Sequence, residues 1–238
     1  MSPSSSALMP HAEGHADVPH AEALAAALRN WCAEQALPIT LHVFDALAST
    51  NTWLIEQGAV PEHQMTAALA IHQTAGRGRR GAQWQSPPAS GLCLSVARTF
   101  AQVPLEPAHL TMALGVSIAE ALTRAGVPDL ALKWPNDLVY AGRKLGGLLV
   151  ETRTLPDGRF FVVAGIGINR QLPAEFQLDE AGWSKGAVDL ARIGIPMSLL
   201  TLTQWVLPAV TDVLQRYTGD DTDAIVRAFE SRQWRPAP

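Results

Sequence analysis

The fold of this chain is decided by residues 130–169, which read LALKWPNDLVYAGRKLGGLLVETRTLPDGRFFVVAGIGIN. Apolar and β-branched residues form three runs in this stretch, and these runs predict strands at residues 130–134, 145–152 and 160–168. Short turns at residues 140–143 and 156–158 suit antiparallel hairpins, because parallel strands need a much longer crossover. We therefore expect consecutive antiparallel strands in this stretch.

Three further strands are predicted nearer the N-terminus, at residues 41–44, 66–72 and 92–97. Apolar residues recur at helical spacing in five segments: residues 20–35, 51–57, 107–125, 196–217 and 221–231. Strands and helices do not alternate regularly along the chain. We therefore expect an α+β fold, with a mixed or mainly antiparallel sheet and helices packed on one face.

The length and composition predict one large domain. The chain has 238 residues and 47% hydrophobic content, which is enough for a packed core. Residues 1–38 are interpreted as an N-terminal arm and helix, in which residues 1–19 form a mobile arm rich in Ser, Pro, His and Gly. Residues 39–238 are expected to form the domain itself, and the sequence after residue 232 is too short to build another.

The charge balance excludes several classes of partner. A net charge of -4 and a pI near 6.0 predict no long-range attraction to DNA, RNA or anionic lipid.

The sequence contains neither an apolar run of about eighteen residues nor a basic start followed by an apolar stretch, so we expect no membrane span and a cytoplasmic protein. Cys32 and Cys93 lack metal-ligand spacing and are predicted to be buried, reduced thiols.

Residues 73–84, QTAGRGRRGAQW, carry the strongest chemical signal. The segment follows a predicted strand, so it should form a loop whose glycines let backbone N–H groups approach an anion closely. Arg77, Arg79 and Arg80 supply forked donors that suit phosphate or carboxylate oxygens. Glycine–arginine repeats also occur in disordered nucleic-acid-binding tails, but the acidic balance and the position at a strand end disfavour that alternative.

Four other motifs accompany the loop. They are Ser-Thr-Asn at 49–51, KWPNDL at 133–138, RKLGGLLVE at 143–151 and GIGIN at 165–169. In this order and at these spacings they closely resemble the catalytic domain of the biotin protein ligases, over about residues 41–215. The resemblance implies a catalytic domain of the class II aminoacyl-tRNA synthetase and biotin ligase type.

The resemblance also implies a two-step reaction. The carboxylate of biotin attacks the α-phosphate of ATP to give biotinyl-5′-AMP and pyrophosphate, with Mg²⁺ bound to the phosphates. A lysine of the biotin carboxyl carrier protein of acetyl-CoA carboxylase then takes the biotinyl group. Neither step needs an enzyme nucleophile, so the protein must position two anions and supply positive charge. The candidate catalytic residues are Arg77, Arg79 and Lys144.

On the biotin side, Ser49 and Thr50 match residues that hydrogen-bond the ureido ring, and Asn51 lies beside them. These residue types also favour an ordinary helix cap, and both roles can coexist. Lys144 matches the lysine between the biotin carboxylate and the α-phosphate, although a lysine that opens a buried strand can also simply reach solvent. The loop and strand residues implied in biotin contact are Gln73, Arg77, Gly78, Arg79 and Gly147.

On the nucleotide side, Trp84 matches an aromatic residue that lies against adenine, and the alternative is a core tryptophan. Asp137 is the candidate partner for the metal or for the acceptor lysine, whereas a Trp-Pro-Asn-Asp turn could owe its residues to turn formation alone. The remaining implied ATP contacts are Arg79, Lys133, Asn136 and Asn169, while the metal ligands stay unassigned.

The chain departs from the family pattern at both ends. Many relatives carry an N-terminal winged helix-turn-helix, but only residues 1–40 precede Leu41 here, so we expect no DNA partner. A small SH3-like barrel usually follows the catalytic domain, and this chain stops near its expected start, which raises doubt about ATP affinity and acceptor docking. Two alternatives stay open, a biotin-binding protein with impaired turnover and a lipoate ligase-like acyltransferase, and the resemblance is compatible with a homodimer.

Overall fold

A computed structural model describes residues 20–178, 183 and 186–235 of the chain. The arm expected at residues 1–19 lies outside the described residues. The core of the fold is one seven-stranded sheet with the order β1-β2-β3-β7-β6-β5-β4. The strands are β1 (Ile39–Leu47), β2 (Met65–Gln73), β3 (Gly91–Phe100), β4 (Ala131–Lys133), β5 (Asp137–Tyr140), β6 (Arg143–Thr154) and β7 (Phe160–Asn169).

Only β1 and β2 are paired in parallel, and every other neighbouring pair in this sheet is antiparallel. The predicted turn at residues 140–143 joins β5 to β6, where Tyr140 pairs with Arg143. The predicted turn at residues 156–158 joins β6 to β7, where Thr154 pairs with Phe160. The prediction of a mixed, mainly antiparallel sheet is confirmed.

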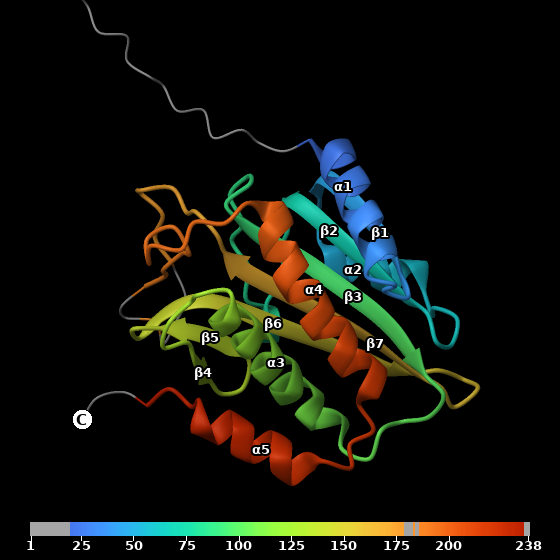
Figure 1. Cartoon of the computed structure of the whole chain (residues 1–238). Coiled ribbons are helices and arrows are strands. Elements are labelled where there is room, and N and C mark those ends of the chain that lie inside the picture. The colour runs from blue at the N-terminus through green and yellow to red at the C-terminus, as the bar shows by residue number, and fades with distance from the viewer. Residues whose placement is uncertain (1–19, 179–182, 184–185, 236–238) are drawn as a thin grey trace, which may run out of the picture.

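Four helices cover one face of the sheet, as Figure 1 shows from the helix side. They are α1 (Ala21–Glu34), α3 (Leu110–Arg124), α4 (Leu199–Arg216) and α5 (Thr222–Ser231). Together with one side of the sheet they bury the main hydrophobic core, to which α1 contributes Leu24 and Leu28. The predicted layer of helices on one face is confirmed.

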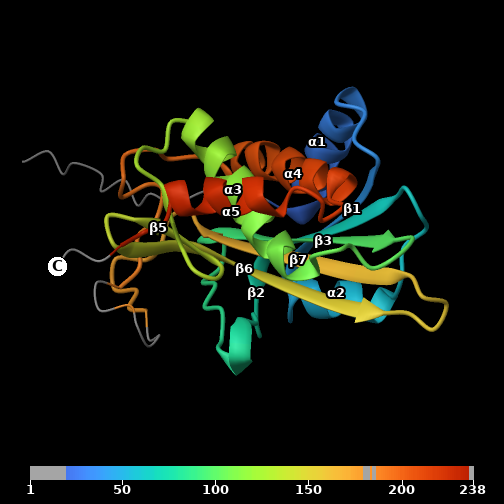
Figure 2. The same cartoon turned by 90° about the horizontal axis from the view of Figure 1, so that it is seen from below.

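The short helix α2 (Thr50–Gln57) lies on the opposite face of the sheet, as Figure 2 shows. There Leu54 packs with Ala68, Ala97, Phe161 and Val163 in a second, smaller core. Neighbouring strand residues point to opposite faces, so Ala67 and Val162 join the main core while Ala68 and Phe161 join the smaller one. Strands that are buried on both faces read as continuous apolar runs.

The structure adds one strand that the sequence did not predict. Residues 135–139 were assigned to no strand, but Asp137 begins β5, which pairs with both β4 and β6. The run Leu138–Val139–Tyr140 is short and lies between turn signals on both sides, so its pattern was too brief to indicate a strand. None of the helices in the described ranges is long and apolar enough to cross a membrane.

Candidate active site

The arginine loop, the start of α2 and residues of five strands line one pocket. It opens on the face of the sheet that carries α2, and Figure 2 shows the loop between β2 and β3 projecting from that face. The sequence-predicted residues in its lining are Ser49, Thr50, Asn51, Gln73, Arg77, Gly78, Arg79, Trp84, Asn136, Asp137, Lys144 and Gly147. Segments that are far apart in the sequence thus converge on one pocket.

The floor of the pocket is glycine backbone on β6 and β7. A Cβ atom on Gly165 would overlap the side-chain oxygen of Asn51 and lie 2.9 Å from its Cγ. A Cβ atom on Gly167 would lie 2.5 Å from ring atoms of Trp84, and one on Gly147 would lie 3.0 Å from Asp137 Oδ1. The contacts at Gly165 and Gly167 are shorter than normal packing allows, and the contact at Gly147 is tighter than most. The side chains of Asn51 and Trp84 can therefore lie where they do only because the floor lacks side chains.

Ser49, Thr50 and Asn51 are held at the start of α2 by hydrogen bonds. Ser49 is the N-cap, and its side chain accepts from the backbone N–H of Thr52 at 3.4 Å. The N–H of Thr50 donates to Gln73 Oε1 at 2.8 Å, which ties α2 to the end of β2. The predicted helix-cap function of this motif is therefore present, and it places all three residues in the pocket wall.

Buried hydroxyl groups continue this network beneath the wall. Thr50 Oγ1 and Ser95 Oγ are 2.6 Å apart, and Ser95 donates to Asn51 Oδ1 at 2.6 Å. The amide nitrogen of Asn51 donates to Leu149 O at 3.1 Å and to Glu151 Oε2 at 2.9 Å. Asn51 is therefore engaged at both ends of its side-chain amide.

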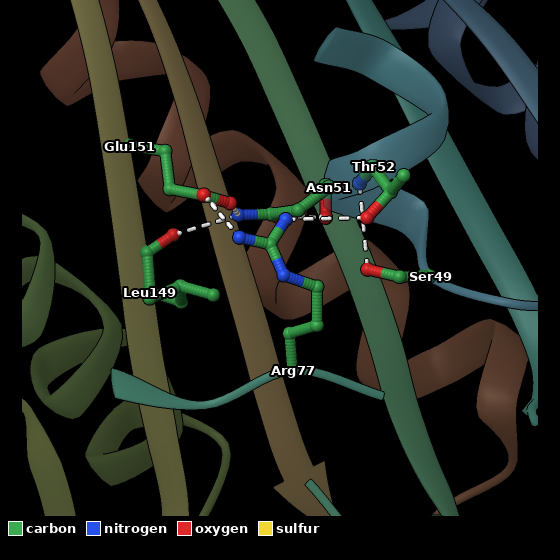
Figure 3. A network of polar contacts seen from close by, with 7 residues as sticks. Ser49, Asn51, Thr52, Arg77, Leu149 and Glu151 are labelled. Atoms are coloured by element: carbon green, nitrogen blue, oxygen red, sulfur yellow. Dashed lines mark hydrogen bonds and ion pairs between the residues drawn. The ribbon is translucent and has the colours of Figure 1, made fainter. Parts of the chain in front are cut away.

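Arg77 reaches from the loop across the pocket to the same network, as Figure 3 shows. Its guanidinium donates to Glu151 Oε1 at 2.6 Å and to Thr52 Oγ1 at 3.2 Å. The Arg77 side chain is 44% exposed and that of Glu151 is 25% exposed, so solvent screens this ion pair. The Glu151 carboxylate on β6 therefore accepts hydrogen bonds from Arg77 of the loop and from Asn51 of α2.

Lys144 lies near the start of β6 and is only 6% exposed. Its ammonium is 3.2 Å from the buried carboxylate of Asp137. The ring centroids of Trp84 and Trp183 each lie 5.8 Å from the same ammonium. A buried cation that adjoins a carboxylate and two indole rings is suited to fixed electrostatic stabilisation of an anion.

Arg79 lies at the exposed side of the pocket. Its guanidinium donates to Asn136 Oδ1 at 3.4 Å, and Asn136 in turn donates to Leu148 O at 2.6 Å. The loop is thus linked to the β4–β5 connection through the side chains of two predicted site residues.

Two predicted site residues are not in the pocket lining. The ammonium of Lys133 lies over the rings of Trp183 and Trp234, at 4.0 and 5.5 Å from their centroids. Asn169 is buried, and its amide nitrogen donates to the carbonyl oxygens of Lys144 and Val188 at 3.2 and 3.0 Å. Lys133 therefore shares the ring of Trp183 with Lys144, and Asn169 bonds the backbone of Lys144 directly.

Three residues with prominent contacts were not predicted as site residues: Ser95, Glu151 and Trp183. Alternation along β6 puts Gly147, Leu149 and Glu151 on one face, so Glu151 could have been found from its motif. Ser95 is a hydroxyl within a buried apolar run, which also indicates a polar partner. No local pattern identifies Trp183, because its contacts join distant segments.

Cys93 lies on β3 near the far end of the loop and is buried, as predicted. Its sulfur is 3.0 Å from Ser86 Oγ. Burial raises the pKa of the Cys93 thiol to about 11, and this thiol is therefore protonated at neutral pH. A protonated, buried thiol is a poor nucleophile.

The chain is similar to known proteins over the region that forms this site. The model of the biotin/lipoate A/B protein ligase family matches residues 43–169. The chain is 32% identical over 176 residues to the bifunctional ligase/repressor BirA of Escherichia coli, covering 74% of this chain and 53% of that protein. It is 34% identical over 145 residues to the biotin–[acetyl-CoA-carboxylase] ligase of Mycobacterium tuberculosis, covering 58% of this chain and 53% of that protein. The chain therefore spans about half the length of these curated relatives.

Solved structures give the same result for the fold. The biotin protein ligase from Aquifex aeolicus in complex with biotin and ATP superposes with a TM-score of 0.64 and 28% identity, covering 82% of this chain and 78% of that chain. The biotin protein ligase from Leishmania major in complex with biotin has a TM-score of 0.62 at 20% identity, covering 85% and 86% of the two chains.

Proposed function

We propose that this chain, which belongs to the biotin/lipoate A/B protein ligase family, activates biotin with ATP and transfers it to a lysine of a biotin carboxyl carrier protein. The observation that carries the proposal is the buried ammonium of Lys144 in a pocket that two loop arginines also line. Such an arrangement suits a reaction between two anions, because their mutual repulsion must be offset before they can meet.

In the first step, a carboxylate oxygen of biotin forms a bond to the α-phosphorus of ATP, and pyrophosphate leaves. Lys144 is proposed to lie between these two groups, where its ammonium can follow the negative charge as it moves. Arg77 and Arg79 are proposed to hold the phosphate and carboxylate oxygens from the loop side. In the second step, the amine of the acceptor lysine attacks the acyl carbon and AMP leaves.

On the biotin side, the proposed contacts are Ser49, Thr50, Gln73 and the backbone at Gly147. Asn51 was also expected to contact biotin, but its amide oxygen accepts from Ser95 and its amide nitrogen donates to Leu149 and Glu151. We therefore propose that Asn51 fixes the pocket wall and leaves the ligand contacts to its neighbours.

On the nucleotide side, the proposed contacts are Arg79, Trp84, Asn136 and Asp137, with Lys133 and Asn169 supporting the region from outside the lining. The described residues contain no group of three or more His, Cys, Asp or Glu side chains that could hold a metal ion. A Mg²⁺ ion would therefore be held mainly by the ATP phosphates, with Asp137 as the one carboxylate among the described lining residues that could reach it. The ion would neutralise charge on the phosphates.

The decisive experiment is biotin-dependent exchange of labelled pyrophosphate into ATP, followed by transfer of biotin to a purified carrier domain. Exchange is expected with biotin, ATP and Mg²⁺ together and not when any one is left out. If folded protein supports neither half-reaction at high ATP concentration, the proposal is wrong. Lys144→Ala serves as the matched protein control, because it should abolish most of the exchange while the fold is retained.

The same preparation distinguishes the alternatives. A biotin-binding protein with impaired turnover would show a higher melting temperature with biotin but no exchange. A lipoate ligase-like acyltransferase would be stabilised by lipoate and would exchange pyrophosphate with lipoate in place of biotin.

The proposed protein partner is the biotin carboxyl carrier protein of acetyl-CoA carboxylase, in keeping with the name of the Mycobacterium tuberculosis relative. The absence of a DNA partner stays a prediction, and retardation of promoter DNA by the chain would contradict it. A homodimer also stays a prediction, which sedimentation with and without biotin would test.

A further inference from the structure

The C-terminal segment of the chain extends the sheet next to the candidate active site. After α5, the chain runs beside β4, which is the last strand of the sheet (Figure 1). Leu132 donates its N–H to Arg232 O and accepts from the N–H of Trp234, both at 2.8 Å. Residues 232–234 thus pair in parallel with an edge strand that would otherwise expose its backbone groups.

This pairing places Trp234 beside two residues of the site region. The ring of Trp234 stacks on that of Trp183, with centroids 6.4 Å apart and an interplanar angle of 28°. The ammonium of Lys133 lies over both rings. Trp183 is only 5% exposed, and we attribute this burial in part to Trp234.

Trp183 is in turn connected to Lys144 by backbone hydrogen bonds. The N–H of Gly186 donates to Trp183 O at 2.8 Å, and the N–H of Lys144 donates to Gly186 O at 3.1 Å. The N–H of Val188 donates to Lys144 O at 3.0 Å, so the segment that follows Trp183 pairs with β6 at Lys144 itself. A shift of Trp183 would therefore act on the backbone that carries the Lys144 side chain.

We propose that residues 232–234 are a positioning element for the candidate active site, in which Trp234 holds Trp183 and thereby the backbone at Lys144. Trp234 does not line the pocket, so it acts through other residues. The effect on catalysis rests on the proposed function, whereas the effect on the backbone at Lys144 does not.

The structural test is amide hydrogen exchange in the full chain carrying Trp234→Ala. Exchange at the amides of Lys144 and Val188 should become about twofold to tenfold faster, the range expected for losing one stacked aromatic pair. Trp205→Ala is the matched control, because Trp205 is a partly exposed tryptophan on α4. It should leave both amides within about twofold of the unmodified chain. If Trp234→Ala does not fold, Trp234→Leu keeps the apolar bulk without the ring and is measured at the same amides.

Unchanged exchange at Lys144 and Val188 in a folded Trp234 variant would overturn the proposal. Equal acceleration at these amides and throughout β3 would also overturn it, because that pattern indicates general destabilisation.

The catalytic test is pyrophosphate exchange by the same variants. Trp234→Ala should lower kcat about threefold to tenfold with the KM for biotin within about twofold, and Trp234→Phe should restore most of the rate. A change in KM alone, or no recovery with Phe, would exclude a role in positioning Lys144. If even the unmodified chain fails to exchange pyrophosphate, the proposed function is wrong, while the hydrogen-exchange result still decides the structural proposal.

Discussion

Gly165→Ala should destabilise the protein severely, although it adds a single methyl group. The new Cβ would overlap Asn51 Oδ1 and lie 2.9 Å from Asn51 Cγ. Asn51 cannot easily move away, since it is 3% exposed and is held by Ser95, Leu149 and Glu151. The substitution therefore removes a buried hydrogen-bond network or forces the strand backbone to shift.

The size of the effect follows from the bonds that Asn51 makes. Two of them join neutral groups and contribute about 1 kcal/mol each, and the bond to the Glu151 carboxylate contributes about 1.5–3 kcal/mol. The lower conformational entropy of unfolded alanine offsets about 0.5–1 kcal/mol of this loss. We expect a net loss of about 2.5–4.5 kcal/mol, which corresponds to a melting temperature about 5–18 °C lower for a chain of this size.

Urea unfolding followed by tryptophan fluorescence measures this loss, and the chain offers a matched control. A Cβ atom on Gly115 in α3 would meet only Leu132 side-chain carbons at 3.6 and 3.9 Å. Gly115→Ala should therefore be neutral or stabilise by up to about 1 kcal/mol, because alanine favours helices. A loss of less than about 1 kcal/mol for Gly165→Ala would refute the reasoning.

A double-mutant cycle with Asn51→Ala makes the test more specific. Once the Asn51 amide is gone, the added methyl group at Gly165 has room, and its further cost should fall below about 0.5 kcal/mol. An undiminished cost in that background would show that the strand backbone, and not Asn51, rejects the methyl group.

Three further predictions concern the pocket, and a fourth concerns folding stability. Gly167→Ala should displace the Trp84 ring, since its Cβ would lie 2.5 Å from ring atoms, and a changed tryptophan fluorescence with a higher KM for ATP would verify this. Lys144→Ala should remove about 3–4 kcal/mol of transition-state stabilisation, and a near-normal adenylation rate would exclude its catalytic role. If the proposed function holds, Arg79→Gly should release biotinyl-AMP roughly tenfold to a hundredfold faster, because charge-assisted hydrogen bonds worth about 1.5–3 kcal/mol are lost. Biotin labelling of serum albumin, compared with that by the unmodified chain, measures the release. Cys93 should make folding stability fall above pH 9, because the unfolded thiol loses its proton near 9.0 while burial holds the folded pKa at about 11. Across this interval the unmodified chain should lose about 2–3 kcal/mol more than Cys93→Ala does in urea unfolding.

The sequence predicted most of the sheet because its strands carry their own local patterns. The hairpin from Arg143 to Asn169 combines two long apolar runs with a Pro-Asp-Gly turn, and these signals follow one another in a single continuous stretch of sequence. By contrast, β5 has only four residues and depends on pairing with β4 and β6, so its local pattern could not indicate it. Short strands are stabilised by their neighbours more than by their own residues.

For the candidate site, the sequence named residues that the structure brings into one pocket, but it did not indicate the contacts between them. The motifs placed Arg77, Asn51 and Lys144 in one pocket, which the structure also does. The Arg77–Glu151 ion pair joins residues from a loop and a strand that are 74 positions apart, and no periodicity links them. No local pattern predicts the stack of Trp183 on Trp234 either, because it depends on how the chain beyond α5 returns to β4.

The glycine floor and the position of Arg77 together suit the anion binding that we propose for this site. Glycines on β6 and β7 leave room for a ligand but supply no charge, so cationic groups must come from the loop and from Lys144. Glu151 keeps the Arg77 guanidinium directed across the pocket at 2.6 Å. A partly exposed pair of this kind contributes only about 0–1 kcal/mol, so a ligand carboxylate or phosphate can compete for the same donors at little cost. Glu151 thereby orients Arg77 toward the proposed ligand position, and the weak ion pair would let a ligand anion replace the carboxylate.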